Sequence, residues 1–180
     1  MREAFHKMFW GFLLVLLEIH IIVVDILPDP IGYIFIILGL AWFRDSYNEA
    51  KKAHQFAIGL AVLSIPSVFI SQQTVNQIGT FASGFGIYGF MMQALNLVLV
   101  YMVFQLLLVV AYQEGANDLA RGTTTLFKMY MVIMIIALIL PIFSIGFVNL
   151  TSLVIVTTLL ALAFEIVFLV WLLKFRKLNS

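Results

Sequence analysis

The chain has 180 residues, of which 63% are apolar and only 11% are charged, and its mean hydropathy is +1.11. Soluble domains are close to half apolar and about a quarter charged, so this composition excludes an ordinary soluble globule and a disordered chain. The formal net charge of +1 gives no basic surface for nucleic acid. The length fits a single domain over residues 1–180. We therefore expect an all-α, polytopic transmembrane helical bundle in a lipid bilayer.

The first apolar stretch begins like a signal peptide, because Arg2 and Lys7 precede it. It also contains the ionisable residues Glu18, His20 and Asp25, and no small-x-small cleavage site follows it. We therefore expect a retained first transmembrane span. The chain has no cysteine, which excludes disulfides, thiolate nucleophiles and Cys-ligated metals.

Apolar stretches predict about six membrane spans, each spanning a bilayer core of roughly 30 Å. In chain order they cover residues 9–27, 31–43, 56–70, 90–112, 126–148 and 150–173. A Pro-Asp-Pro sequence at residues 28–30 predicts a turn between the first two spans. The Gly-rich residues 79–89 are expected to form a close helix contact, a re-entrant or irregular segment, or a loop.

All ten cations fall on one side of this arrangement. They precede the first span, lie between the second and third and between the fourth and fifth, and follow the sixth. The positive-inside rule then places both termini in the cytoplasm. Trp10, Trp42 and Trp171 fall at the same ends of their spans, where aromatic residues anchor helices at the membrane interface.

Ionisable side chains within the predicted spans are the first candidates for function. A charge at the bilayer centre costs roughly 2.5–3.5 kcal/mol on insertion scales, so such groups usually face the protein interior. The first span holds Glu18, His20 and Asp25, and the sixth holds Glu165. Glu18 and Glu165 both lie about 13 Å from the cytoplasmic end of their helices. Glu18 and Asp25 share one helix face.

Polar side chains in the fourth and sixth spans extend this pattern. Gln93 and Asn96 lie three residues apart on one face, and Thr151, Thr158 and Glu165 repeat every seven residues. This pattern indicates a polar interior between the first, fourth and sixth spans, which suits a small polar solute, a cation or a proton relay. The alternative is that these groups only hold helices together, through hydrogen bonds of roughly 0.6 kcal/mol each.

Two short motifs match catalytic or nucleotide-binding signatures without their structural context. Residues 84–89 spell GxGxxG, but no βαβ unit surrounds them and no acidic residue follows about 20 positions later. His20 and Asp25 have the HxxxxD spacing of glycerolipid acyltransferases, yet on a helix their side chains diverge by about 140°. We therefore expect no enzymatic activity, no catalytic residue, no metal site and no cofactor.

Residues 25–33, D-I-L-P-D-P-I-G-Y, resemble a D-[IL]-L-P-D-x-I-G-Y motif. The motif belongs to a family of small, uncharacterised integral membrane proteins from Firmicutes-type bacteria. The resemblance implies a multi-pass protein of the bacterial plasma membrane and no particular activity. Within the motif, Gly32 allows the close approach of two backbones, and Tyr33 can place its hydroxyl on a carboxylate at the outer interface. The other matching positions are Asp25, Pro28 and Asp29.

A second likeness, of size and topology only, is to the substrate-binding S components of energy-coupling-factor transporters, although the AxxxA pattern of their first helix is absent here. The leading expectation is binding or transport of a small solute, cation or proton. The alternative is a non-catalytic subunit or regulator that meets a membrane-protein partner, or a second copy, through the charged residues 44–55. The candidate binding residues are Glu18, His20, Asp25, Asp29, Tyr33, Gln93, Asn96 and Glu165.

Overall fold

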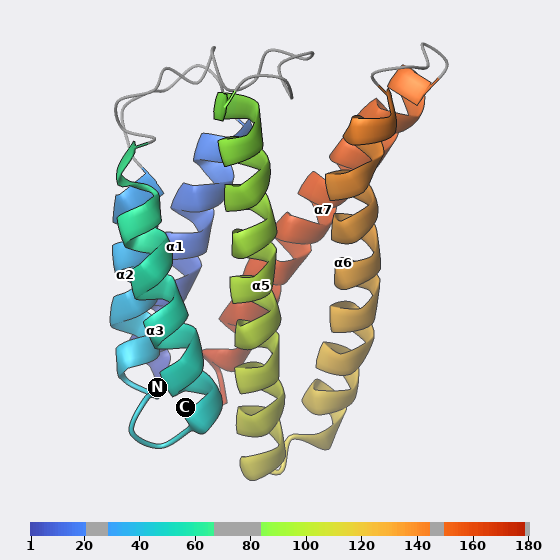
Figure 1. The fold of residues 1–180 in the computed structure, drawn as a ribbon. Coiled ribbons are helices and arrows are strands. Elements are labelled where there is room, and N and C mark those ends of the chain that lie inside the picture. The colour runs from blue at the N-terminus through green and yellow to red at the C-terminus, as the bar shows by residue number, and fades with distance from the viewer. Residues whose placement is uncertain (21–28, 67–83, 145–149, 179–180) are drawn as a thin grey trace.

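The structure is a computed structural model that describes residues 1–20, 29–66, 84–144 and 150–178. These residues form an all-helical bundle without strands (Figure 1), which confirms the fold class expected from composition. The helices are α1 (Arg2–His20), α2 (Asp29–Ala41), α3 (Asn48–Leu63), α5 (Gly84–Gln113), α6 (Asn117–Ser144) and α7 (Thr151–Phe175).

Three of the described helices are long and apolar enough to cross a membrane. They are Gly86–Gln113, Asn117–Phe143 and Ser152–Phe175, and Pro30–Ala41 is a shorter apolar helix. The chain is therefore a membrane protein by the length and composition of its helices. The total of six spans stays a prediction.

Several helices begin earlier than the apolar stretches do. α3 begins at Asn48 rather than at residue 56, and α6 begins at Asn117 rather than at residue 126. Backbone hydrogen bonds define a helix, and hydrophobicity defines only the part of it that lipid surrounds. The first turns of α3 and α6 thus extend the bundle beyond its apolar layer.

The Gly-rich sequence at residues 84–89 forms the first turns of α5 as regular helix. The expectation of an irregular segment or loop is wrong for these residues, and residues 79–83 lie outside the described part of the chain. The hydroxyl of Tyr88 donates a 2.8 Å hydrogen bond to the carbonyl of Leu63, which joins the start of α5 to the end of α3.

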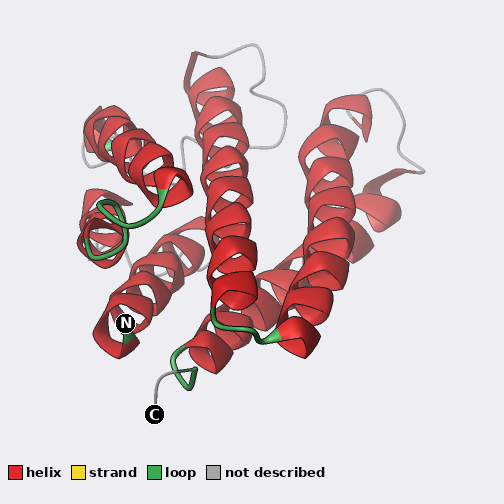
Figure 2. Cartoon of the chain, turned by 90° about the horizontal axis from the view of Figure 1, so that it is seen from below, coloured by secondary structure: helices red, strands yellow, loops and turns green. Residues whose placement is uncertain are grey.

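Each helix packs against the next one along the described chain, and α7 returns to α1, so the helices form a closed ring (Figure 2). α7 crosses the bundle obliquely, from α6 at one end to α1 at the end that carries both termini (Figure 1). The α2–α3 and α5–α6 connections lie at this same end. The helix ends that carry the cations are therefore together.

Aromatic side chains fill the centre of the ring. Phe5 of α1 packs between Phe43 and Phe175, with ring centroids 5.1 and 5.6 Å apart. Deeper in the bundle, Phe104 of α5 contacts Phe168 of α7 at 5.0 Å. These rings are at most 2% exposed, so they form a buried aromatic core along the bundle.

Candidate functional site

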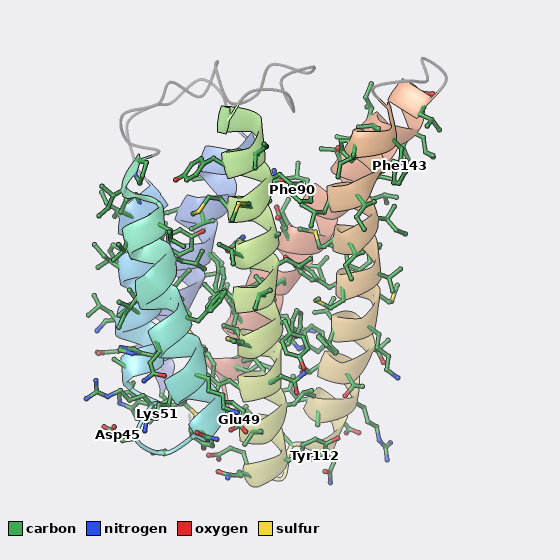
Figure 3. The ribbon with its side chains drawn as sticks, in the orientation of Figure 1. Asp45, Glu49, Lys51, Phe90, Tyr112 and Phe143 are labelled. Atoms are coloured by element: carbon green, nitrogen blue, oxygen red, sulfur yellow. The ribbon has the colours of Figure 1, made fainter. Side chains whose placement is uncertain are left out.

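A cavity of about 160 Å³ lies between α5, α6 and α7. Its α5 residues, Gln93, Asn96 and Leu97, lie toward the Phe90 end of the helix, far from Tyr112 (Figure 3). Its remaining walls are mostly apolar side chains of α6 and α7. Its polar lining consists of Gln93, Asn96, Tyr130, Thr158 and Glu165.

Helix periodicity explains why these side chains share one space. Gln93 and Asn96 lie three residues apart on α5, and Thr158 and Glu165 lie seven apart on α7. Positions three, four or seven residues apart on an α-helix face the same direction. The polar stripes of the fourth and sixth predicted spans therefore meet across the cavity.

Three of the polar residues also border a second, smaller cavity of about 20 Å³. Asn96, Tyr130 and Glu165 separate the two spaces, and apolar residues of α1, including Phe12 and Leu16, close the smaller one. Glu165 is 9% exposed, and its Oε2 atom is shielded from solvent. A carboxyl group thus lies at the junction of three helices near α1.

The junction offers several oxygen acceptors, beside the donors of Tyr130, Gln93 and Asn96. Oδ1 of Asn96 is buried and accepts no hydrogen bond from the described residues. The Thr158 hydroxyl donates its hydrogen to the carbonyl of Val154 at 2.9 Å. Because that hydrogen is used, the Thr158 oxygen can only accept a hydrogen bond from a further partner. Together with the carboxyl of Glu165, these groups favour an occupant that donates hydrogen bonds or carries positive charge.

Pro141 of α6 adds a backbone acceptor beside the same cavity. Proline has no amide hydrogen, so it cannot donate to the carbonyl of Ala137 four residues earlier. Pro141 and Ala137 both line the cavity. The helix continues through Pro141 to Ser144, so the carbonyl of Ala137 loses its usual helical donor next to the cavity.

The structure brings together only part of the predicted site. Gln93, Asn96 and Glu165 line one cavity, as their spacing predicts. Tyr33 is not among the residues that line it, and its side chain is 2% exposed within the buried core of the bundle. Asp25 lies outside the described residues, and of Glu18, His20 and Asp29 the structure describes only the helical backbone.

α6 supplies the part of the site that sequence reasoning missed. Tyr130 is 2% exposed, lines both cavities and packs against Phe104 and Phe168, with ring centroids 5.5 and 5.7 Å apart. The signal was present, because Tyr130 and Pro141 are eleven residues apart and share a helix face. The α1 residues that line the smaller cavity are apolar, so any polar contribution of α1 stays a prediction.

The described parts of the chain contain no cluster of side chains that could bind a metal ion. Among residues 1–20, 29–66, 84–144 and 150–178, no three His, Asp or Glu side chains gather as possible ligands. Among the lining residues that the structure describes, Glu165 is the one acidic group.

Compared with known proteins, the chain matches no family model, no curated protein and no solved structure. The resemblance of residues 25–33 to a membrane-protein motif therefore stays a prediction. A functional proposal has to depend on the geometry of the cavity.

Proposed function

We propose that this protein is a multi-pass protein of the bacterial plasma membrane that binds and transports a small cation, or a proton in its place, at Glu165. The observation that carries the proposal is the placement of Asn96 and Glu165. Oδ1 of Asn96 and Oε2 of Glu165 are buried, and both side chains line one cavity from different helices. A buried carboxyl in a membrane protein typically marks an ion pathway or proton relay.

The size and charge of the site define the class of occupant. One carboxylate balances one positive charge, which favours a monovalent ion or a small protonated amine. A cavity of about 160 Å³ exceeds the roughly 30 Å³ that a water molecule occupies in the liquid. The site therefore has room for an alkali cation with part of its hydration shell.

The hydrogen-bond pattern favours a binding site over simple helix–helix attachment. Attachment would pair the polar groups of neighbouring helices with one another. The Thr158 hydroxyl instead bonds to its own helix, and Oδ1 of Asn96 has no donor in the described part of the structure. An acceptor that is buried without a donor costs free energy, which a bound cation recovers.

Two further features support transport in a defined orientation. Pro141 interrupts the hydrogen bonding of α6 next to the cavity, and transporters place irregular helices at their binding sites. Both termini lie at the end of the bundle where the cation-bearing connections meet (Figure 1). By the positive-inside rule, this end faces the cytoplasm.

Thermal unfolding of the purified protein in detergent tests the proposal. NaCl, KCl and LiCl are compared with choline chloride at equal ionic strength, over a range of pH that covers protonation. We expect at least one alkali cation, or protonation, to raise Tm in the wild type and not in Glu165→Gln. A saturating ligand at about 100 times its Kd adds about 2.7 kcal/mol of stability.

The matched control is Glu3→Gln, which removes an exposed carboxylate at the other end of the bundle. It should keep the wild-type response. Uptake of the same cation into proteoliposomes then tests transport. An identical response of wild type and Glu165→Gln to every cation and to pH would overturn the proposal.

A further inference from the structure

A second polar pocket lies at the end of the bundle that carries the termini, away from the Glu165 cavity. Its volume is about 710 Å³, and the α2–α3 connection and the first half of α3 form its walls. Arg44, Lys51 and His54 line it together with Asp45, so we call it the basic pocket. Asp45 and Lys51 lie close to each other at this end of the molecule (Figure 3).

The basic pocket leads directly into an apolar surface. Lys51, Gln55 and Ile58 line the pocket and lie on one face of α3, at spacings of four and three residues. The same face continues with Val62, and Ile65 follows in the turn after α3 ends at Leu63. The apolar side chains of this face are well exposed, at 43% for Ile58, 60% for Val62 and 49% for Ile65.

This change from basic to apolar occurs at the level expected for lipid headgroups. Trp42, at the end of the bundle that bears the cations, is 56% exposed and packs edge-to-face against Phe43 with ring centroids 4.9 Å apart. Exposed tryptophans of membrane helices lie at the boundary between headgroups and acyl chains. Arg44 follows two residues later, so its charge lies at the same boundary.

The cationic groups have donors left for an anion. Nε of Arg44 pairs with Asp45 at 3.2 Å, and the guanidinium has further N–H donors that this single contact does not use. Arg44 lowers the pKa of His54, after the larger effect of burial, so the two side chains lie within electrostatic range of each other. An anion between them would relieve this repulsion.

We propose that the basic pocket binds the phosphate of an anionic phospholipid from the cytoplasmic leaflet. Arg44, Lys51 and His54 surround the headgroup. The acyl chains lie along Ile58, Val62 and Ile65. A soluble anion would use only the polar half of this surface, whereas a phospholipid uses both halves, and basic pockets beside membrane helices bind such headgroups.

Native mass spectrometry tests the proposal on the full chain released from vesicles of phosphatidylglycerol and phosphatidylcholine. We expect wild type to retain phosphatidylglycerol selectively. Arg44→Gln with Lys51→Gln should weaken retention roughly 10- to 30-fold. The matched control, Arg121→Gln with Lys128→Gln, removes the same charge from exposed positions on α6 and should retain the lipid as wild type does.

A second variant keeps the proposal testable if the double variant does not fold. Val62→Ser leaves every charge in place but makes the apolar surface polar, and it should also reduce retention of phosphatidylglycerol. Equal retention in wild type and both variants would overturn the proposal. If inorganic phosphate alone raises Tm as much as phosphatidylglycerol does, the pocket binds a soluble anion. If a protein co-purifies through Arg44 and Lys51 while both variants keep the lipid, the pocket binds a protein partner. Either result contradicts lipid binding.

Discussion

Gly11 of α1 and Gly32 of α2 lie face to face across a close contact between the two helices. A Cβ atom at Gly11 would lie 2.7 Å from the carbonyl oxygen of Gly32, and one at Gly32 would lie 3.0 Å from the carbonyl oxygen of Gly11. Cβ atoms essentially never approach other atoms closer than 3.0 Å. The expectation that Gly32 allows two backbones to approach closely is confirmed.

Gly11→Ala and Gly32→Ala should each destabilise the protein, because the added methyl group meets backbone atoms that cannot move independently. Overpacking of this kind costs about 1–3 kcal/mol. Thermal unfolding in detergent measures the effect as a lower Tm. Gly59→Ala on α3 is the control, since a Cβ there meets nothing within 4 Å and alanine favours helix. A Tm for Gly32→Ala at or above that of Gly59→Ala would contradict the close contact.

Trp171 attaches α7 to α6 toward the end of the bundle that carries the termini. Its indole N–H donates a 2.9 Å hydrogen bond to the hydroxyl of Thr123, and the ring lies against Gly122, where a Cβ would approach it to 2.8 Å. Thr123→Val leaves the indole N–H without this acceptor and should lower stability by about 1 kcal/mol. Chemical denaturation of wild type and variant measures the difference.

Thr125→Val is the matched control for the Trp171 contact. Thr125 is exposed, and among the described residues its hydroxyl bonds only to the carbonyl of Arg121 in its own helix. We expect this variant to unfold within a few tenths of a kcal/mol of wild type. If both threonine variants lose the same stability, the hydrogen bond to Trp171 makes no specific contribution.

Pro141→Ala should change the stability of α6 and cation binding at the cavity in opposite directions. The variant restores an amide donor for the carbonyl of Ala137, so α6 gains a helical hydrogen bond and helix propensity. We expect a higher Tm without ligand, together with a smaller stabilisation by the bound cation. Titration of Tm with the cation measures both changes in one experiment. An unchanged cation response would show that the Ala137 carbonyl takes no part in binding.

His54 is expected to titrate below its ordinary range. Burial lowers its pKa, Arg44 lowers it further, and Asp45 raises it. The unfolded pKa is about 6.5. Because the folded pKa lies below it, the contribution of His54 to stability is complete above about pH 6.5 and decreases as the pH falls through the folded pKa.

NMR titration of the His54 ring tests this assignment of causes. Arg44→Gln should raise the pKa of His54, and Asp45→Asn should lower it. Lys51 and Gln55 also line the pocket, so Gln55→Ala, a neutral change, serves as the control. Shifts of the same sign in the Arg44 and Asp45 variants would contradict the electrostatic account.

The fold class and half of the site were predictable because they depend on composition and periodicity. Gln93, Asn96, Thr158 and Glu165 stand out as polar positions in apolar helices, and helix geometry places each pair on one face. The missing half came from α6. Tyr130 reads as an ordinary aromatic core residue until the oblique path of α7 places it beside Glu165, and that path depends on packing between helices.

The ends of the helices were harder to predict, for a physical reason. Hydropathy locates the lipid-facing part of a helix, whereas α3 and α6 extend from it into polar sequence. The Gly-rich start of α5 shows the same limit. Its glycines permit irregular backbone, yet residues 84–89 are helical, and the hydrogen bond from Tyr88 to Leu63 is a tertiary contact that local sequence does not encode.

Direct binding of a labelled alkali cation to wild type and Glu165→Gln tests the central claim. The purified protein is equilibrated with radioactive sodium or rubidium, and bound cation is counted against unlabelled competitors and against pH. We predict saturable binding of one cation per chain in wild type, competition by protons, and loss of binding in Glu165→Gln with Glu3→Gln unaffected. Saturable binding that persists unchanged in Glu165→Gln would contradict the account.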